Sequence, residues 1–371
     1  MKLIARIALL PDADQYRQLF AVLERVNAAC DFISRAAWDA KAFGKYPLQK
    51  LVYADARKAF GLSANLTIRA ICKVADAYKL DKKRQRTFKP HGAIAYDYQI
   101  VSYRLRDMTV SLQVLDGRIR LPFTCGARAR ELMATQHGES DLIYRDGRFY
   151  LFAPCDVEEP TPADAGEFLG IDLGVTNIAT DSDGTIYAAN HLKNVRYRHR
   201  RLRTRLQKKG TKSAKRRLKA LAGKERRFAT NTNHVISKQI VARAKGTGRG
   251  VALEDLTHIR TRITVRHTQR VTLHSWAFDQ LGQHITYKAR LAGVRVIRVD
   301  PRNTSRTCPA CGHIAKANRT TQAAFRCTDC GHAGHADTIA AGNIASRASL
   351  NMPYVEGMDH CAAPLSTSSA L

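Results

Sequence analysis

The chain has 371 residues, of which 44% are hydrophobic, so it can bury a sizeable core divided between two or three domains. Its 61 lysines and arginines against 32 aspartates and glutamates give a net charge of +29, which predicts a nucleic-acid partner. No apolar run reaches the roughly 20 residues of a membrane span, and the amino terminus has no signal-peptide cleavage site. These features exclude a membrane protein, and we expect a cytoplasmic location.

The amino-terminal part of the sequence combines helical and strand patterns. Residues 2–10 read as a strand, and three amphipathic stretches with helical spacing follow between residues 14 and 80. From about residue 94 the pattern changes to short strands, at residues 95–98, 108–122 and 142–152, with turn signals at Asp116-Gly117 and Asp146-Gly147. Because the first strand stands alone before the helices, we expect it to join the later strands. Residues 1–10 and 91–160 then form a small β-barrel, and residues 11–90 form a helical insertion.

A carboxylate stands at the centre of the next apolar run, in residues 168–181. Asp172 is flanked by Gly170 and Gly174, which allow another backbone or a phosphate to come close. An ionisable group in a buried strand needs a partner such as a metal ion. Glu254 and Asp337 are two further isolated acids on other elements, and three such carboxylates suit a two-metal phosphodiester-cleaving site. We therefore predict that Asp172, Glu254 and Asp337 are catalytic and bind Mg²⁺.

Each acid also has a structural interpretation. Asp172 is compatible with a hydrogen-bonded strand residue, and Asp337 with an acid at a helix amino terminus. Glu254 precedes Asp255, and adjacent strand residues point to opposite faces, so only one of the two can face Asp172. Glu254 is preferred because it ends the buried run of Val251 and Leu253.

The order of elements after the linker at residues 161–166 is strand, strand, helices, strand, helix, strand. This order is typical of an α/β sheet of the ribonuclease-H type. Residues 167–301 and 336–350 are assigned to this domain, so the whole chain is expected to be a multidomain α+β protein. The polar stretch 257–269 is predicted to be mobile, and residues 351–371 are predicted to be a disordered tail.

Two long basic helices are predicted within the α/β domain, meeting near Gly210-Thr211. Between Lys193 and Arg227 the sequence has one acid, Glu225, and few apolar residues. A solvated charged face is the simpler interpretation, but like charges at this density repel one another. We therefore predict that nucleic-acid phosphates bind along Arg196, Arg198, Arg200, Arg201, Arg203, Arg205, Lys208, Lys209, Lys212, Lys215, Arg216 and Arg217.

Four of the nine cysteines have the spacing of metal ligands. Cys308 and Cys311 form one Cys-x-x-Cys-Gly-His unit, and Cys327 and Cys330 form a second, so unpaired surface cysteines are a poor explanation. Four thiolates suit a closed, structural zinc site that leaves no open position for catalysis, and such a site needs neither histidine. The sequence therefore predicts a zinc ribbon over residues 302–335.

Together these motifs resemble the TnpB family, transposon-encoded RNA-guided DNA nucleases similar to compact type V CRISPR effectors. The resemblance runs from Leu3 to about Ala348. It is carried mainly by Gly170-Ile171-Asp172-Leu173-Gly174, by Leu253-Glu254-Asp255-Leu256, by Ser305-Arg306-Thr307-Cys308-Pro309-Ala310-Cys311-Gly312, and by the Asp337 segment.

The resemblance implies a wedge barrel with a recognition insertion, followed by a RuvC-like nuclease domain that contains the zinc ribbon. It also implies a guide RNA from the transposon end, double-stranded target DNA, a monomer, and a prokaryotic protein acting at the nucleoid. The sequence departs from the family at Ile339, where asparagine is usual. A guide-directed DNA-binding regulator without cleavage, a transposase and a ribosome-associated zinc-ribbon protein remain the alternatives.

Overall fold

The computed structural model describes residues 1–174, 177–188, 190–256 and 278–350. The stretch predicted to be mobile and the predicted tail lie outside these residues. The chain divides into two compact units, Met1–Glu158 and Glu159–Leu371. The two units are described separately below.

Three helices of the first unit form its helical insertion. Asp12 caps the first of them, because its carboxylate accepts hydrogen bonds from the backbone of Asp14 and Gln15, and the Gln15 side chain completes a capping box. Apolar residues at helical spacing, such as Leu19, Leu23 and Val26, are fully buried between the helices. The helices are α1 (Ala13–Asp39), α2 (Lys45–Phe60) and α3 (Ala64–Leu80).

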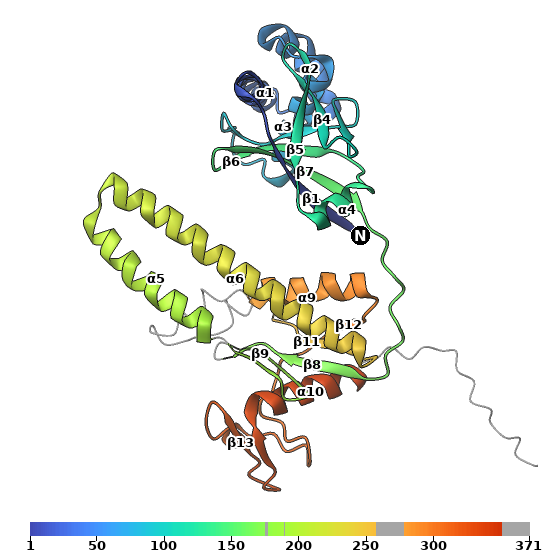
Figure 1. The fold of residues 1–371 in the computed structure, drawn as a ribbon, viewed down its shortest axis with the longest axis vertical. Coiled ribbons are helices and arrows are strands. Elements are labelled where there is room, and N and C mark those ends of the chain that lie inside the picture. The colour runs from blue at the N-terminus through green and yellow to red at the C-terminus, as the bar shows by residue number, and fades with distance from the viewer. Residues whose placement is uncertain (175–176, 189, 257–277, 351–371) are drawn as a thin grey trace, which may run out of the picture. The chain divides into compact units, whose positions relative to one another are not determined.

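The strands of the first unit form one antiparallel sheet, a half-barrel, in the order β2-β6-β7-β1-β5-β4-β3. The first strand of the chain pairs with β7 on one side and β5 on the other, as its isolated position predicted (Figure 1). The strands are β1 (Lys2–Leu9), β2 (Ile94–Tyr96), β3 (Val101–Arg104), β4 (Thr109–Val114), β5 (Gly117–Thr124), β6 (Ser140–Arg145) and β7 (Arg148–Asp156).

Two elements of the first unit were not predicted from the sequence. Strand β3 has only four residues, of which Val101 alone is buried, so its apolar signal is too weak to recognise. Helix α4 (Ala127–Met133) has seven residues and no side-chain cap. Tertiary contacts stabilise both: β3 pairs with β4, and Met133 is buried.

The second unit is built on a five-stranded mixed sheet in the order β10-β9-β8-β11-β12. Strands β8, β11 and β12 are parallel, β9 is antiparallel to β8, and β10 is antiparallel to β9. The strands are β8 (Phe168–Asp172), β9 (Asn177–Asp181), β10 (Ile186–Ala188), β11 (Gly250–Glu254) and β12 (Val296–Val299).

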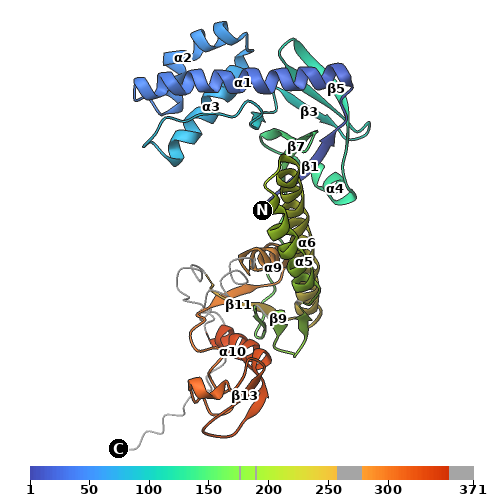
Figure 2. The same cartoon turned by 90° about the vertical axis from the view of Figure 1, so that its left-hand side faces the viewer.

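Helices cover both faces of this sheet. Helices α6 (Lys212–Gly246) and α9 (Phe278–Ala292) lie on one face, and α10 (Ala336–Leu350) lies on the other (Figures 1 and 2). Two separate apolar clusters, one on each face, follow from the alternation of strand side chains. Helix α5 (Asn190–Lys209) pairs with the first half of α6 as a hairpin that extends beyond the sheet.

Gly170 allows α10 to approach the centre of the sheet. A Cβ atom at this position would overlap the carbonyl oxygen of Ala341 and lie 2.7 Å from the backbone nitrogen of Ala345. We expect Gly170→Ala to destabilise the second unit by about 1–3 kcal/mol, because helix backbone has to move. Gly166→Ala is the matched control, since a Cβ at Gly166 meets nothing within 4 Å. Equal melting temperatures for the two variants would contradict this packing.

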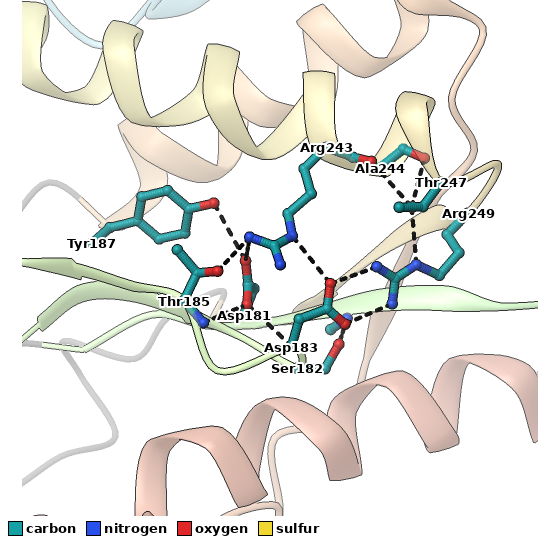
Figure 3. Close-up of polar contacts among 10 residues, drawn as sticks. Asp181, Ser182, Asp183, Thr185, Tyr187, Arg243, Ala244, Thr247 and Arg249 are labelled. Carbon is teal, nitrogen blue, oxygen red and sulfur yellow. Dashed lines mark hydrogen bonds and ion pairs between the residues drawn. The ribbon is translucent and has the colours of Figure 1, made fainter.

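The turn between β9 and β10 is fixed to the end of α6 by a buried ionic cluster (Figure 3). Asp181 is fully buried, and its carboxylate accepts hydrogen bonds from the backbone nitrogens of Thr185 at 2.8 Å and Asp183 at 3.1 Å. Arg249 donates both of its terminal nitrogens to Asp183 at 2.8 and 2.6 Å, and Arg243 Nε donates to it at 3.1 Å. These arginine contacts hold the pKa of Asp183 below its usual value. The cluster keeps β9 in register beside β8.

Candidate active site

Strand alternation places two of the predicted acids on the same face of the sheet. Leu253 of β11 lies beside Ile171 of β8, so one residue further along both parallel strands Glu254 lies beside Asp172. Leu253 and Ile171 belong to the apolar cluster on the α6 and α9 face. Asp172 and Glu254 therefore point to the opposite face, where α10 packs. Asp255 follows on the other side and is exposed.

The third acid reaches this face from the first turn of α10. Asp337 is 7% exposed, and two side chains from distant parts of the chain hold its carboxylate. Asn177, the first residue of β9, donates its amide to Oδ2 at 3.0 Å. Arg319, from the zinc ribbon, donates Nη2 to Oδ1 at 3.0 Å. The orientation of Asp337 is thus set by the sheet and the ribbon together.

The pKa values of two acids record how crowded the carboxylates are. Burial, followed by the nearby charges of Glu254 and Asp337, raises the pKa of Asp172 to about 7, while Arg319 acts in the opposite direction. Burial also raises the pKa of Glu254, although a hydrogen bond from Thr304 Oγ1 at 2.6 Å opposes that shift. A carboxylate cluster that disfavours its own ionisation is a suitable site for a divalent cation.

The donor set fits a hard cation, because it consists of carboxylate oxygens that need positive charge. Among the residues that the structure describes, only the four cysteines bring three or more candidate ligand atoms within 4.8 Å of one another. At least one pair among the three acids is therefore more than 4.8 Å apart. They share one face and one electrostatic environment, as the charge effects on Asp172 require.

Several residues at this site were missed by the sequence analysis. Arg319 and Asn177 contact Asp337, and Thr304 contacts Glu254. Asn343 of α10 supports Thr304, because its amide donates to the carbonyl oxygens of Thr304 and Thr307, both at 2.8 Å. Asn177 stands five residues after Asp172, and this proximity was a possible signal. The other three lie in polar segments that give no local indication of their contacts.

We expect Arg319→Gln to lower the rate of any metal-dependent cleavage by about 10–100-fold, because Asp337 loses a charged partner that orients it. Arg326→Gln is the matched control, since Arg326 is an exposed arginine on a strand of the same ribbon. The measurement is the initial rate of DNA cleavage at saturating Mg²⁺. Equal rates for the two variants would show that Arg319 does not position the third acid.

The four predicted zinc ligands converge in the structure. Cys308 Sγ lies 3.6 Å from Cys330 Sγ, and Cys311 Sγ lies 3.6 Å from Cys327 Sγ. The two knuckles have matching backbone bonds, since Cys308 N donates to His313 O at 2.9 Å and Cys327 N donates to His332 O at 2.8 Å. This arrangement of four thiols fits one tetrahedral zinc ion, and neither histidine side chain is among the grouped ligands.

The rest of the ribbon comprises a short 3₁₀ turn, η1 (Lys316–Asn318), and a hairpin of β13 (Ala324–Arg326) and β14 (Ala333–His335). Ile339 packs against the small core of this ribbon, which includes Phe325 and Cys308. Isoleucine at position 339, where the family usually has asparagine, therefore adds to the contact between α10 and the ribbon.

The predicted phosphate-binding residues fall into two groups on α5 and α6. Ten of the twelve are exposed, but Arg196 and Arg203 are partly buried and turn toward the one acid of the region. Arg203 donates to Glu225 at 2.8 Å, and Arg196 Nε lies 3.9 Å from the same carboxylate. These two arginines therefore lie on the inner face of the hairpin, whereas the other ten side chains are exposed. Helical spacing alone did not reveal that the inner face is also charged.

Among the described helices, none combines the length and apolarity needed to cross a bilayer.

Comparison with known proteins identifies two matched regions. A family model described as probable transposase, OrfB_IS605, matches residues 152–258, and one described as Cas12f1-like, TNB domain, matches residues 278–344. The CRISPR-associated endodeoxyribonuclease Cas12f1 of Sulfoacidibacillus thermotolerans is 34% identical over 230 residues, which cover 57% of this chain and 53% of that protein. A TnpB-like protein of Methanocaldococcus jannaschii is 29% identical over 197 residues, covering 49% of this chain and 69% of that protein.

The fold is also similar to that of a solved complex, Cas12f1 with single-guide RNA and target DNA. The TM-score is 0.63 at 18% identity, over 89% of this chain and 81% of that one. The chain spans about half the length of the Cas12f1 relatives that it matches.

Proposed function

Since the chain belongs to the TnpB family, we propose that it is an RNA-guided DNA endonuclease that cleaves by metal-dependent phosphodiester hydrolysis. The observation that carries the proposal is the common face shared by Asp172, Glu254 and Asp337. The similarity of this chain to Cas12f1, a protein named as an endodeoxyribonuclease, supports DNA as the substrate. Base pairing with a guide RNA from the transposon end reads the target sequence, and the protein contacts backbone and shape.

In this mechanism Asp172, Glu254 and Asp337 would hold Mg²⁺, and the bound ion would supply activation of a water molecule and charge stabilisation at the leaving oxygen. Thr304 fixes one oxygen of Glu254, and Asn177 and Arg319 fix both oxygens of Asp337. Arg319 also places a positive charge beside the acids, where it stabilises the additional negative charge of a phosphate. The exposed cations of α5 and α6 attract nucleic-acid strands to the second unit.

The experiment that tests the proposal has two steps. First, the RNA that co-purifies with the protein is sequenced, and we expect a defined scaffold with one variable end. Second, the purified complex is given Mg²⁺ and a plasmid that carries the matching target. Linear product indicates a nuclease, joined products bearing transposon ends indicate a transposase, and target binding without product indicates a regulator. Either of the last two results would refute the proposal.

A further inference from the structure

Three basic side chains of α5 converge on one carboxylate of α6. The side chains of Arg196, His199 and Arg203 recur at intervals of three and four residues and share the inner face of the hairpin. Arg203 Nη2 is 2.8 Å from Glu225 Oε2, His199 Nδ1 is 3.7 Å from the same oxygen, and Arg196 Nε is 3.9 Å from Oε1. Elsewhere on this inner face of α5 the corresponding positions are occupied by leucines, whereas these three positions carry basic side chains.

The charges of this cluster do not balance. Two guanidinium groups face one carboxylate, and the side chains of Arg196 and Glu225 are only 16% and 18% exposed. Burial lowers the pKa of Arg196, which shows that its positive charge is held at a cost. Partly buried positive charge in excess is stabilised when an anion joins it.

A cavity of about 410 Å³ opens beside this cluster, between α5, α6 and α9. Both cationic side chains and neutral hydrogen-bonding side chains line this cavity. Gln280 of α9 is held in place there, since it donates to Thr230 Oγ1 at 3.2 Å and accepts from Asn233 at 3.0 Å. The polar lining residues are Arg196, Arg203, Glu225, Arg226, Thr230 and Gln280.

We propose that this cavity binds a phosphate group of a nucleic-acid strand. The inference rests on the proposed function for the identity of the strand, but the cavity's preference for an anion follows from its own charges. Guanidinium groups match the oxygens of a phosphate, and the lining carries three arginines against one carboxylate. The volume lies in the range of small-ligand sites, so it accommodates a phosphate with part of its attached nucleoside. Exposed cations on both helices lead a strand to its mouth.

The test uses variants whose expected effects have opposite signs. Affinities are measured for inorganic phosphate by calorimetry and for a short fluorescein-labelled single-stranded DNA by anisotropy, without guide or divalent cation. We expect Arg226→Gln to weaken binding of both probes by about tenfold, because a charge-assisted hydrogen bond is lost. We expect Glu225→Gln to strengthen binding of both, because the opposing carboxylate is removed.

Two control variants distinguish a specific phosphate-binding site from a non-specific effect of the protein's net charge. Asp116→Asn adds the same charge as Glu225→Gln in an exposed turn of the first unit, and Arg326→Gln removes an exposed cation from the cysteine ribbon, away from α5 and α6. The proposal requires that neither control changes the affinity for inorganic phosphate. Equal effects of Glu225→Gln and Asp116→Asn would overturn the proposal. Binding of inorganic phosphate in the cavity without competition from the DNA would also overturn it. Because these assays need no cleavage, failure of the nuclease assignment leaves their outcome unaffected.

Discussion

Asp172→Ala is expected to lower DNA cleavage by on the order of 10³-fold or more while leaving RNA binding intact. Asp172 lies at the centre of the acidic face, between Glu254 on the next strand and Asp337 on α10. Removing it takes away a ligand for the cation that supplies several kcal/mol of transition-state stabilisation. The measurement is the single-turnover cleavage rate of the purified protein–RNA complex on a plasmid target.

Asp255→Ala is the matched control, because Asp255 is an exposed acid beside Glu254 that faces away from the site. Its cleavage rate should equal that of the unmodified protein. If Asp172→Ala cleaves at the unmodified rate, the assignment of this acid to the catalytic site is wrong.

The same residue predicts an effect of pH on stability. The pKa of Asp172 rises from an ordinary 3.8 to about 7 in the folded protein. The folded state therefore binds this proton more tightly than the unfolded state, so the contribution of Asp172 to stability is most favourable below about pH 4 and declines as the pH rises toward 7. The shift corresponds to a penalty of up to about 4 kcal/mol above pH 7.

Asp172→Asn removes this charge while keeping the shape of the side chain. In buffer without added divalent cations, we expect this variant to melt at a higher temperature than the unmodified protein at pH 8. The two should converge at pH 4. Added Mg²⁺ should raise the melting temperature of the unmodified protein more than that of the variant. A constant difference across this pH range would contradict the buried, crowded environment of Asp172.

Cys308→Ser is expected to abolish zinc retention and reduce cleavage to background, while the first unit and the five-stranded sheet of the second unit stay folded. The ribbon has a core of only a few buried residues, including Phe325 and Cys327, so a bound zinc ion would supply most of its folding energy. Asn318 crosslinks the two knuckle segments, donating to Arg306 O at 2.9 Å and accepting from Thr328 N at 2.9 Å. Without zinc this frame is lost, and Arg319 loses the geometry that brings it to Asp337.

Zinc content is measured by elemental analysis, ribbon unfolding by limited proteolysis, and cleavage in the plasmid assay. Cys125→Ser is the control, since Cys125 is partly buried in the first unit and lies outside the cysteine group. It should retain zinc and activity. A Cys308→Ser protein that lacks zinc yet cleaves at the unmodified rate would show that the ribbon does not support the active site.

The local features of this protein were determined by sequence alone. Cys-x-x-Cys spacing fixes two ligands on one knuckle because the intervening turn is short, and helical or strand periods reveal which residues avoid water. Asp172 and Glu254 were recognised because a carboxylate in an apolar strand stands out from its neighbours. That the first strand joins the later strands followed from its isolation in the chain, whereas its place between β5 and β7 is known only from the structure.

Contacts between distant segments were decided only by the tertiary structure. Arg319 and Asn177 reach Asp337 from 18 and 160 residues away, and nothing in the sequence around Arg319 indicates its contact. The sorting of α5 arginines into inner and outer groups likewise depends on where Glu225 lies on the facing helix. Local patterns reflect the partition of each segment between water and core, whereas side-chain pairing depends on packing between elements that sequence spacing does not specify.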